Sequence, residues 1–255
     1  MGACARPGAF LSWGDDVIMC TGFIKQGKDT IFGFNMDLPD GLWDFKVYPK
    51  KDMFYVGIKV NGKVYKTHGV NAKGQFANVP YMNAPECGKY RRGKDYRRLD
   101  LLVNDYISGK LDYQDVRKIT ETKMIVNVPE CSMHTLFGDS NGHMLLVEPG
   151  FKAEEQTGDH SVISNFPILE KPENLVPEND GWYGVDRYQK AEDMLAKAGE
   201  SFGLTEGMKV LEAVSQTLYA PTRVSFVYSV NTHTVRYVLE RNYTDAKEYQ
   251  LSIEA

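Results

Sequence analysis

Two Asn-Gly dipeptides, each between apolar segments, restrict the fold of this 255-residue chain more than any other local feature. Both residues of such a dipeptide tolerate the positive φ angles of a two-residue turn, which makes it the strongest short-range signal for a β-hairpin. The dipeptides and the segments that they join are Asn61-Gly62, between 53–60 and 63–68, and Asn141-Gly142, between 133–137 and 143–147. We predict a further hairpin that turns at Gly27-Lys28-Asp29 and returns along the chain as far as Asn35.

Helical spacing of apolar residues appears between the hairpins. One stripe consists of Leu99, Leu102, Val103, Tyr106 and Ile107. Gly109 can end this helix, and Asp112 can begin the next.

A second pair of helices is predicted later, over residues 188–198 and from the candidate N-cap Thr205 to Leu218. Two strands, 223–230 and 235–240, complete the pattern. Hairpins separated by helix pairs predict a layered α+β domain in which helices cover two packed sheets.

Charge and composition argue against several classes of protein. The formal net charge of −4 argues against nucleic-acid binding. No apolar stretch approaches the ~20 residues of a membrane span, and Asp15 and Asp16 make residues 1–19 a poor secretory signal. The four cysteines form no CxxC pair, so we predict no zinc site. A cytoplasmic protein is the expectation.

The motif Met19-Cys20-Thr21-Gly22 runs directly into the first hairpin. If Cys20 became the first residue, its α-amino group, with a pKa near ~8, could serve as the base for its own thiol. Such a thiol is expected to be accessible and to have a lowered pKa. Taken alone, a cysteine at the start of a strand is more often a core residue.

Four further motifs follow in a fixed order. They are Phe32-Gly33-Phe34-Asn35-Met36-Asp37, Gly69-Val70-Asn71-Ala72-Lys73-Gly74, Phe137-Gly138-Asp139 leading to Val147-Glu148, and Ser164-Asn165-Phe166-Pro167. With the Cys20 motif, this set resembles the choloylglycine hydrolase family, which includes bile salt hydrolases and penicillin V acylases. The resemblance runs from Met19 to about Asn242. It implies a four-layer αββα sandwich of the N-terminal-nucleophile hydrolase type, formed by one domain over residues 20–255.

The resemblance also implies an activity, the hydrolysis of a linear non-peptide amide bond in a small-molecule acyl amide. Cys20 would be the nucleophile, and water would release the acyl-enzyme. Residues 1–19, a leader or a misassigned start, would then be absent from the mature chain. No metal or organic cofactor is implied.

Four more catalytic residues follow from the resemblance. Asp37, otherwise interpreted as a turn residue, would orient the terminal ammonium group. Asn165 would donate its amide to the oxyanion of a tetrahedral intermediate, together with Tyr81. Arg187 would hold Cys20 and Asp37 by charge-assisted hydrogen bonds, although a surface arginine is an equal alternative.

Tyr81 is assigned by counting without gaps from the motif that ends at Gly74, and a small gap would point to Asn78 or Asn83 instead. Bile salt hydrolases have asparagine at this position and penicillin V acylases have tyrosine. The residue therefore favours phenoxyacetyl or aliphatic acyl amides over bile salt conjugates.

Two departures from the family pattern leave alternatives open. Phe34 replaces an arginine, although its place on one strand face with Phe32 and Met36 predicts an apolar environment. Asn165 and Arg187 are only 22 positions apart, so this chain lacks an excursion that helps bile salt hydrolases to form tetramers. The quaternary structure of the family therefore cannot be carried over, and a homo-oligomer is one possibility. A catalytically silent protein that binds an acyl ligand and an acyltransferase are the alternative functions.

The five histidines offer a papain-like alternative with a Cys-His pair. None of them has a supporting local signature near a cysteine. His134, in a predicted strand, is expected to be a core histidine with satisfied hydrogen bonds.

Overall fold

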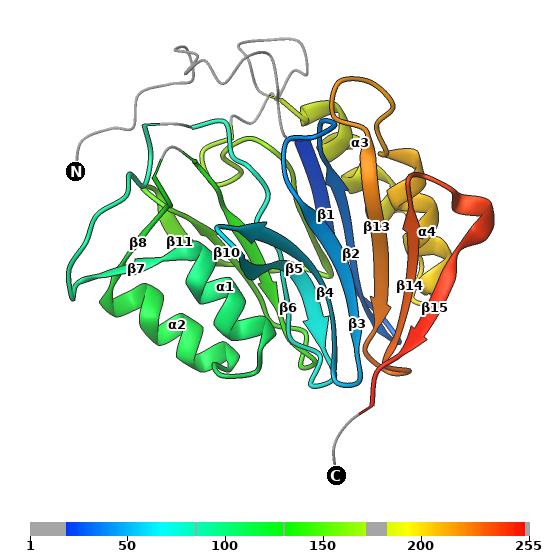
Figure 1. Cartoon of the computed structure of the whole chain (residues 1–255). Helices are drawn as coiled ribbons and strands as arrows, with labels where there is room; N and C mark the ends of the chain where they lie inside the picture. The colour runs from blue at the N-terminus through cyan, green and yellow to red at the C-terminus, as the bar shows by residue number, and fades with distance from the viewer. Residues whose placement is uncertain (1–18, 85, 130, 172–182, 253–255) are drawn as a thin grey trace.

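Two antiparallel sheets lie face to face at the centre of the molecule (Figure 1). The computed structural model describes residues 19–84, 86–129, 131–171 and 183–252. The first sheet has the order β12-β1-β2-β13-β14-β15 and consists of β1 (Met19–Gln26), β2 (Thr30–Asp37), β12 (His160–Ile163), β13 (Thr222–Ser229), β14 (Thr234–Leu239) and β15 (Lys247–Gln250).

The second sheet lies against the inner face of the first and has the order β11-β10-β9-β6-β5-β4-β3. It consists of β3 (Phe45–Lys50), β4 (Met53–Val60), β5 (Lys63–Asn71), β6 (Phe76–Ala77), β9 (Thr135–Gly138), β10 (Met144–Glu148) and β11 (Lys152–Glu155). A separate parallel pair is formed by β7 (Tyr96–Arg98) and β8 (Met124–Val126).

Helices cover the outer face of each sheet, which gives the four-layer αββα sandwich that the sequence predicted (Figure 1). The second sheet carries α1 (Leu99–Ile107), which contacts β5 and β6, and α2 (Tyr113–Thr122). The first carries α3 (Val185–Ala196) on β12 and α4 (Leu204–Ala213) on β2 and β13. A short 3-10 helix, η1 (Tyr243–Asp245), precedes β15. None of the helices in the described residues is both long and apolar enough to cross a membrane.

The predicted hairpins are confirmed at all three turns, as β1–β2, β4–β5 and β9–β10. Asp112 is confirmed as the N-cap of α2, because its carboxylate accepts the Asp115 backbone N–H at 2.8 Å. Thr205 as an N-cap is wrong. The cap of α4 is Gly203, whose N–H donates to the Glu206 carboxylate at 3.2 Å.

The expected extension of α4 to Leu218 is also wrong, since this side chain is 69% exposed and the helix ends at Ala213. Beyond that end the chain is held by other partners. The backbone N–H of Gln216 donates to the Thr222 hydroxyl at 2.9 Å, and the Thr222 N–H returns to the Gln216 carbonyl at 3.1 Å. These bonds hold the segment as a loop, although the apolar periodicity predicted that the helix would continue through it.

The inner face of β2 forms the centre of the core, as its alternation predicted. Phe32 stacks on Phe76 of β6, with ring centroids 4.9 Å apart, and Phe34 stacks on His68 of β5 at 4.2 Å. Burial lowers the pKa of His68 to about 3, so Phe34 faces a neutral imidazole, which accepts the Val79 N–H at 3.1 Å. An arginine at position 34, which the family resemblance would place there, would have to bury its charge where Phe34 is fully buried.

Strand pairing brings the start of β1, the end of β2 and the start of β13 together at the same end of the first sheet, at the top of Figure 1. Cys20 is opposite Met36, and Asp37 is opposite both Met19 and Thr222. Opposite residues in an antiparallel pair share a face, so Cys20 lies on the inner face with Met36. Asp37, one residue on, lies on the outer face beneath α3 and α4.

We predict that Phe34→Arg lowers the free energy of unfolding by roughly 3–5 kcal/mol, because it removes a buried ring and leaves a buried charge unpaired. Chemical denaturation of the parent and the variant measures this difference. Tyr219→Arg is the matched control, since Tyr219 is 82% exposed and a surface substitution shifts stability by only about 0.5 kcal/mol. A Phe34→Arg chain as stable as this control would contradict the placement of Phe34 in the core.

Candidate active site

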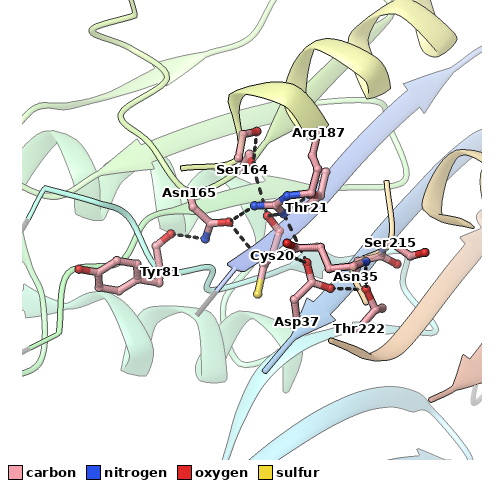
Figure 2. A network of polar contacts seen from close by, with 12 residues as sticks. Cys20, Thr21, Asn35, Asp37, Tyr81, Ser164, Asn165, Arg187, Ser215 and Thr222 are labelled. Atoms are coloured by element: carbon pink, nitrogen blue, oxygen red, sulfur yellow. Dashed lines mark hydrogen bonds and ion pairs between the residues drawn. The ribbon is translucent and has the colours of Figure 1, made fainter. Parts of the chain in front are cut away.

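Cys20 lies at the edge of the sandwich with both of its backbone polar groups bound by distant residues (Figure 2). Its N–H donates to Asn165 Oδ1 at 2.7 Å. Its carbonyl oxygen accepts from Arg187 Nη1 at 2.9 Å and from Ser164 Oγ at 3.3 Å. The main chain of Cys20 is therefore fixed by residues that precede and begin α3, more than 140 positions along the chain.

Arg187 connects the predicted site residues. It lies in the first turn of α3 and is only 5% exposed, so the alternative of a surface arginine is wrong. Nη1 donates to the Cys20 carbonyl, to Thr21 Oγ1 at 2.7 Å and to Asp37 Oδ2 at 3.4 Å, while Nη2 donates to Asn165 Oδ1 at 2.9 Å. One guanidinium group thus contacts three of the four other residues that the sequence nominated.

Gly184 makes this close approach possible. It has a left-handed φ of +83°, and a Cβ atom there would lie 2.3 Å from Ser164 Oγ and 2.5 Å from Arg187 Nη2. The Gly184 carbonyl also accepts from Ser164 Oγ at 2.9 Å. Sequence reasoning missed Gly184, because its role depends on a contact with a residue 20 positions away.

The Asp37 carboxylate is fully buried and has hydrogen bonds at both oxygens. Oδ1 accepts from Thr222 Oγ1 at 2.6 Å, and Oδ2 accepts from Gln216 Nε2 at 2.9 Å and from Arg187. Burial nevertheless raises the pKa of Asp37 to about 6, because desolvation outweighs Arg187 and the hydrogen bonds. Sequence reasoning missed Thr222 and Gln216, which no local motif marks; only the pairing of β13 with β2 brings them here.

The Cys20 thiol differs from the accessible, acidic thiol expected from the sequence. The residue is only 2% exposed, and burial, together with the negative charge of Asp37, raises the pKa of the thiol to about 12. Arg187 opposes this shift without overcoming it. In this chain the Cys20 nitrogen belongs to the Met19–Cys20 peptide bond, so it carries no charge and cannot act as a base. The thiol of this chain is therefore protonated at neutral pH.

Asn165, fully buried after β12, has a fixed amide orientation. Its Oδ1 receives two donors, from Cys20 and Arg187, so its Nδ2 must face the other way, where it donates to the Tyr81 carbonyl at 2.7 Å. Nδ2 carries two hydrogens, and this bond uses one of them. The Asn83 N–H donates in turn to the Asn165 carbonyl at 2.8 Å.

Tyr81 contacts one other predicted residue, Asn165, through its main-chain carbonyl. Figure 2 shows its carbonyl directed at Asn165 and its ring pointing away from Cys20. Burial raises the pKa of its phenol, with Cys131 as the next contribution. If Tyr81 takes part in chemistry at Cys20, it therefore does so through its backbone groups.

The chain resembles solved structures of amide-cleaving enzymes at low sequence identity. Two structures of the conjugated bile acid hydrolase from Clostridium perfringens are each 16% identical, with TM-scores of 0.59 and 0.60; each alignment covers 92% of this chain and 99% of the other. Penicillin V acylase from Agrobacterium tumefaciens is 15% identical over 86% of this chain and 83% of its own, with a TM-score of 0.55.

A Caenorhabditis elegans ortholog of N-acylethanolamine-hydrolyzing acid amidase is 13% identical over 82% of this chain and 92% of its own, with a TM-score of 0.53. No family model and no curated protein sequence matches the chain. The likenesses establish the fold, which is that of the N-terminal-nucleophile hydrolases, as the ordered motifs implied.

The raised pKa of Asp37 predicts a pH-dependent stability. Because the folded chain favours the protonated carboxyl, this stabilisation is complete below the unfolded pKa near 3.8 and is lost as the pH rises through about 6. The free energy of unfolding, measured relative to Asp37→Asn by chemical denaturation, should fall by roughly 3 kcal/mol across that window. Asp44→Asn, at an exposed position, is the control. A difference that grows with pH would contradict the desolvated environment of Asp37.

Proposed function

We propose that this protein is an amide hydrolase that uses Cys20 as an N-terminal nucleophile once residues 1–19 are removed. One observation carries the proposal. The buried guanidinium of Arg187 donates to Cys20, Asp37 and Asn165 together, on a fold shared with three kinds of amide-cleaving enzyme. A group of residues that served only to fill the core would not need a buried cation and carboxylate beside a thiol.

Removal of Met19 would supply the missing base. The Cys20 nitrogen would become an α-amino group, whose ordinary pKa is near ~8, still beside Asn165 Oδ1. It would take the thiol proton as Sγ attacks the carbonyl carbon of the substrate. When the C–N bond breaks, the ammonium returns this proton to the leaving amine. Water, deprotonated by the same amino group, then hydrolyses the thioester and restores the thiol.

Asn165 would stabilise the oxyanion of each tetrahedral intermediate with the second hydrogen of Nδ2, alongside the backbone N–H of Tyr81. Arg187 would hold the main chain of Cys20 and balance the charge of Asp37. Asp37 would stabilise the ammonium group. A new positive charge here should also lower the pKa of both the Asp37 carboxyl and the Cys20 thiol.

The proposed substrate is a small acyl amide, and no metal or organic cofactor takes part in these steps. Tyr81, in place of asparagine, favours phenoxyacetyl or aliphatic acyl groups over bile acids. A cytoplasmic location remains part of the proposal.

Two alternatives use the same site. A silent protein that binds an acyl ligand is favoured by the buried thiol with its raised pKa and by Phe34 in place of the family arginine. An acyltransferase would differ only in the acceptor, an amine in place of water, at the thioester step.

We predict that Cys20→Ala abolishes amide hydrolysis while the variant still unfolds cooperatively. The reason is that no other described thiol lies in the Arg187 network; Cys131, the second free cysteine of the described residues, lies near Tyr81. Release of amine from an acyl amide measures the activity. Cys131→Ala is the matched control and should retain turnover. Hydrolysis by Cys20→Ala would end the proposal.

The requirement for a terminal amine is tested with two chains, one that begins at Cys20 and one in which residues 1–19 are retained. Intact mass identifies the first residue of each. Full activity from a chain that keeps Met19 would exclude the α-amino mechanism. Thioester formation without hydrolysis in the chain that begins at Cys20 would favour the acyltransferase, whereas no thioester in either chain would favour the silent protein.

The choice of substrate gives a further prediction. A panel of penicillin V, an acyl homoserine lactone, an N-acylethanolamine and glycocholate should show the highest kcat/KM for one of the first three, because Tyr81 replaces the asparagine of bile salt hydrolases. Tyr81→Asn serves as the comparison chain. A clear preference of the parent for glycocholate would contradict this assignment.

A further inference from the structure

A buried histidine that the proposed chemistry does not use lies directly behind the candidate site. His134, at the end of the segment before β9, is fully buried, and both of its ring nitrogens have partners. Nε2 lies 2.5 Å from the Ser164 carbonyl oxygen, and Nδ1 lies 3.0 Å from Glu148 Oε1. A carbonyl oxygen only accepts, so Nε2 carries a hydrogen.

Glu148, at the end of β10, determines the state of the other nitrogen. Its side chain is fully buried, and its oxygens already accept two backbone donors, Ile168 N–H at 2.7 Å and Leu169 N–H at 3.1 Å. A carboxylate only accepts, so when Glu148 is ionised Nδ1 of His134 donates to it, and the pair is then an imidazolium and a carboxylate inside the core.

His134 and Glu148 together hold both segments that supply the candidate oxyanion groups, the Asn165 segment through their side chains and the Tyr81 segment through the backbone of His134. The His134 ring binds the carbonyl of Ser164, the residue before Asn165, while Glu148 binds the chain just after it, at Ile168 and Leu169. The backbone N–H of His134 donates to the Pro80 carbonyl, next to Tyr81, at 3.2 Å. Asn165 and Tyr81 are therefore positioned from one residue, and they contact each other through Asn165 Nδ2.

We infer that His134 and Glu148 are positioning residues, and that their buried ion pair holds Asn165 in the orientation in which it binds Cys20 and faces a substrate. The inference rests on the proposed function for its effect on catalysis, although the ion pair and the orientation of Asn165 can be measured without it. A buried pair of this kind costs desolvation, and apolar residues of similar volume would often be as stable, so stability alone does not account for it.

The protonation state is tested on the parent chain by NMR of protein with ¹⁵N-labelled histidine. At neutral pH we expect two ring N–H protons for His134, assigned by their loss in His134→Gln. A single ring N–H would overturn the ion pair. This measurement requires no turnover and no variant beyond the one used for assignment.

The positioning effect is tested by hydrogen exchange of the Cys20 backbone amide in the chain that retains Met19, since this N–H donates to Asn165 Oδ1. Glu148→Gln replaces one of the two carboxylate oxygens with an NH2 donor, so the bond from Ile168 N–H or from Leu169 N–H is lost, and exchange of the Cys20 amide should become faster by roughly tenfold or more. Unchanged exchange in the folded variant would overturn the positioning role, whether or not the protein proves to be an amidase.

In the chain that begins at Cys20, Glu148→Gln should lower kcat by roughly 10- to 100-fold with KM changed by less than about threefold, because the loss falls on the oxyanion group. His134→Gln, whose amide can still donate to Ser164, should retain more activity than His134→Ala. Equal kcat in folded Glu148→Gln and parent would overturn the inference, while a parent inactive on every amide would refute the proposed function alone.

The turn of the same hairpin provides the matched control. His143 Nδ1 lies 2.8 Å from Asp139 Oδ2, but the His143 side chain is 47% exposed and the pair is at the opposite end of β9 and β10. His143→Gln and Asp139→Asn should leave kcat and exchange of the Cys20 amide unchanged. If they reduced both as much as Glu148→Gln does, the effect would belong to the hairpin as a whole and the inference would be wrong.

Discussion

The candidate site depends on how one buried cation is satisfied. A guanidinium cannot leave water without acceptors for its N–H groups, since a buried unpaired charge costs several kcal/mol. Arg187 finds these acceptors on β1, at the end of β2 and after β12. The requirement joins α3 to three separate segments. The arrangement of Cys20, Asp37 and Asn165 is thus a consequence of neutralising Arg187 as much as of strand geometry.

Burial dominates the electrostatics of this group even with Arg187 present. The pKa of Asp37 is raised although a cation and two neutral donors contact it, and the pKa of the Cys20 thiol is raised further. Both acids would therefore respond strongly to one additional positive charge in the same enclosure. A peptide nitrogen at Cys20 carries no charge and leaves both pKa values raised. An ammonium group in the same place would lower the pKa of the Asp37 carboxyl and of the Cys20 thiol.

Local sequence signals predicted the elements well where hydrogen bonding is local. Asn-Gly turns and the Asp112 cap are examples, since every atom that they require lies within a few residues. The loop from Gln216 to Thr222 could not be predicted. Its hydrogen bonds replace those of a longer helix, and two of them are made to Asp37, which is far away in sequence. Among the candidate site residues, the family resemblance nominated Asp37, Asn165 and Arg187, which the structure brings together around Cys20. Gly184 is invisible in sequence, since only contact in space makes a side chain there impossible.

The pairing of β13 with β2 has a consequence for how the protein is made. Thr222 lies 185 positions after Asp37, yet its hydroxyl completes the carboxylate's hydrogen bonds and its strand covers one side of β2. Contacts of such separation form slowly, because a long loop must close first. On the ribosome, β2 keeps one unpaired side until β13 has emerged. The buried charges of the candidate site can be enclosed only after that, and a chain that stops before β13 would expose an apolar strand instead.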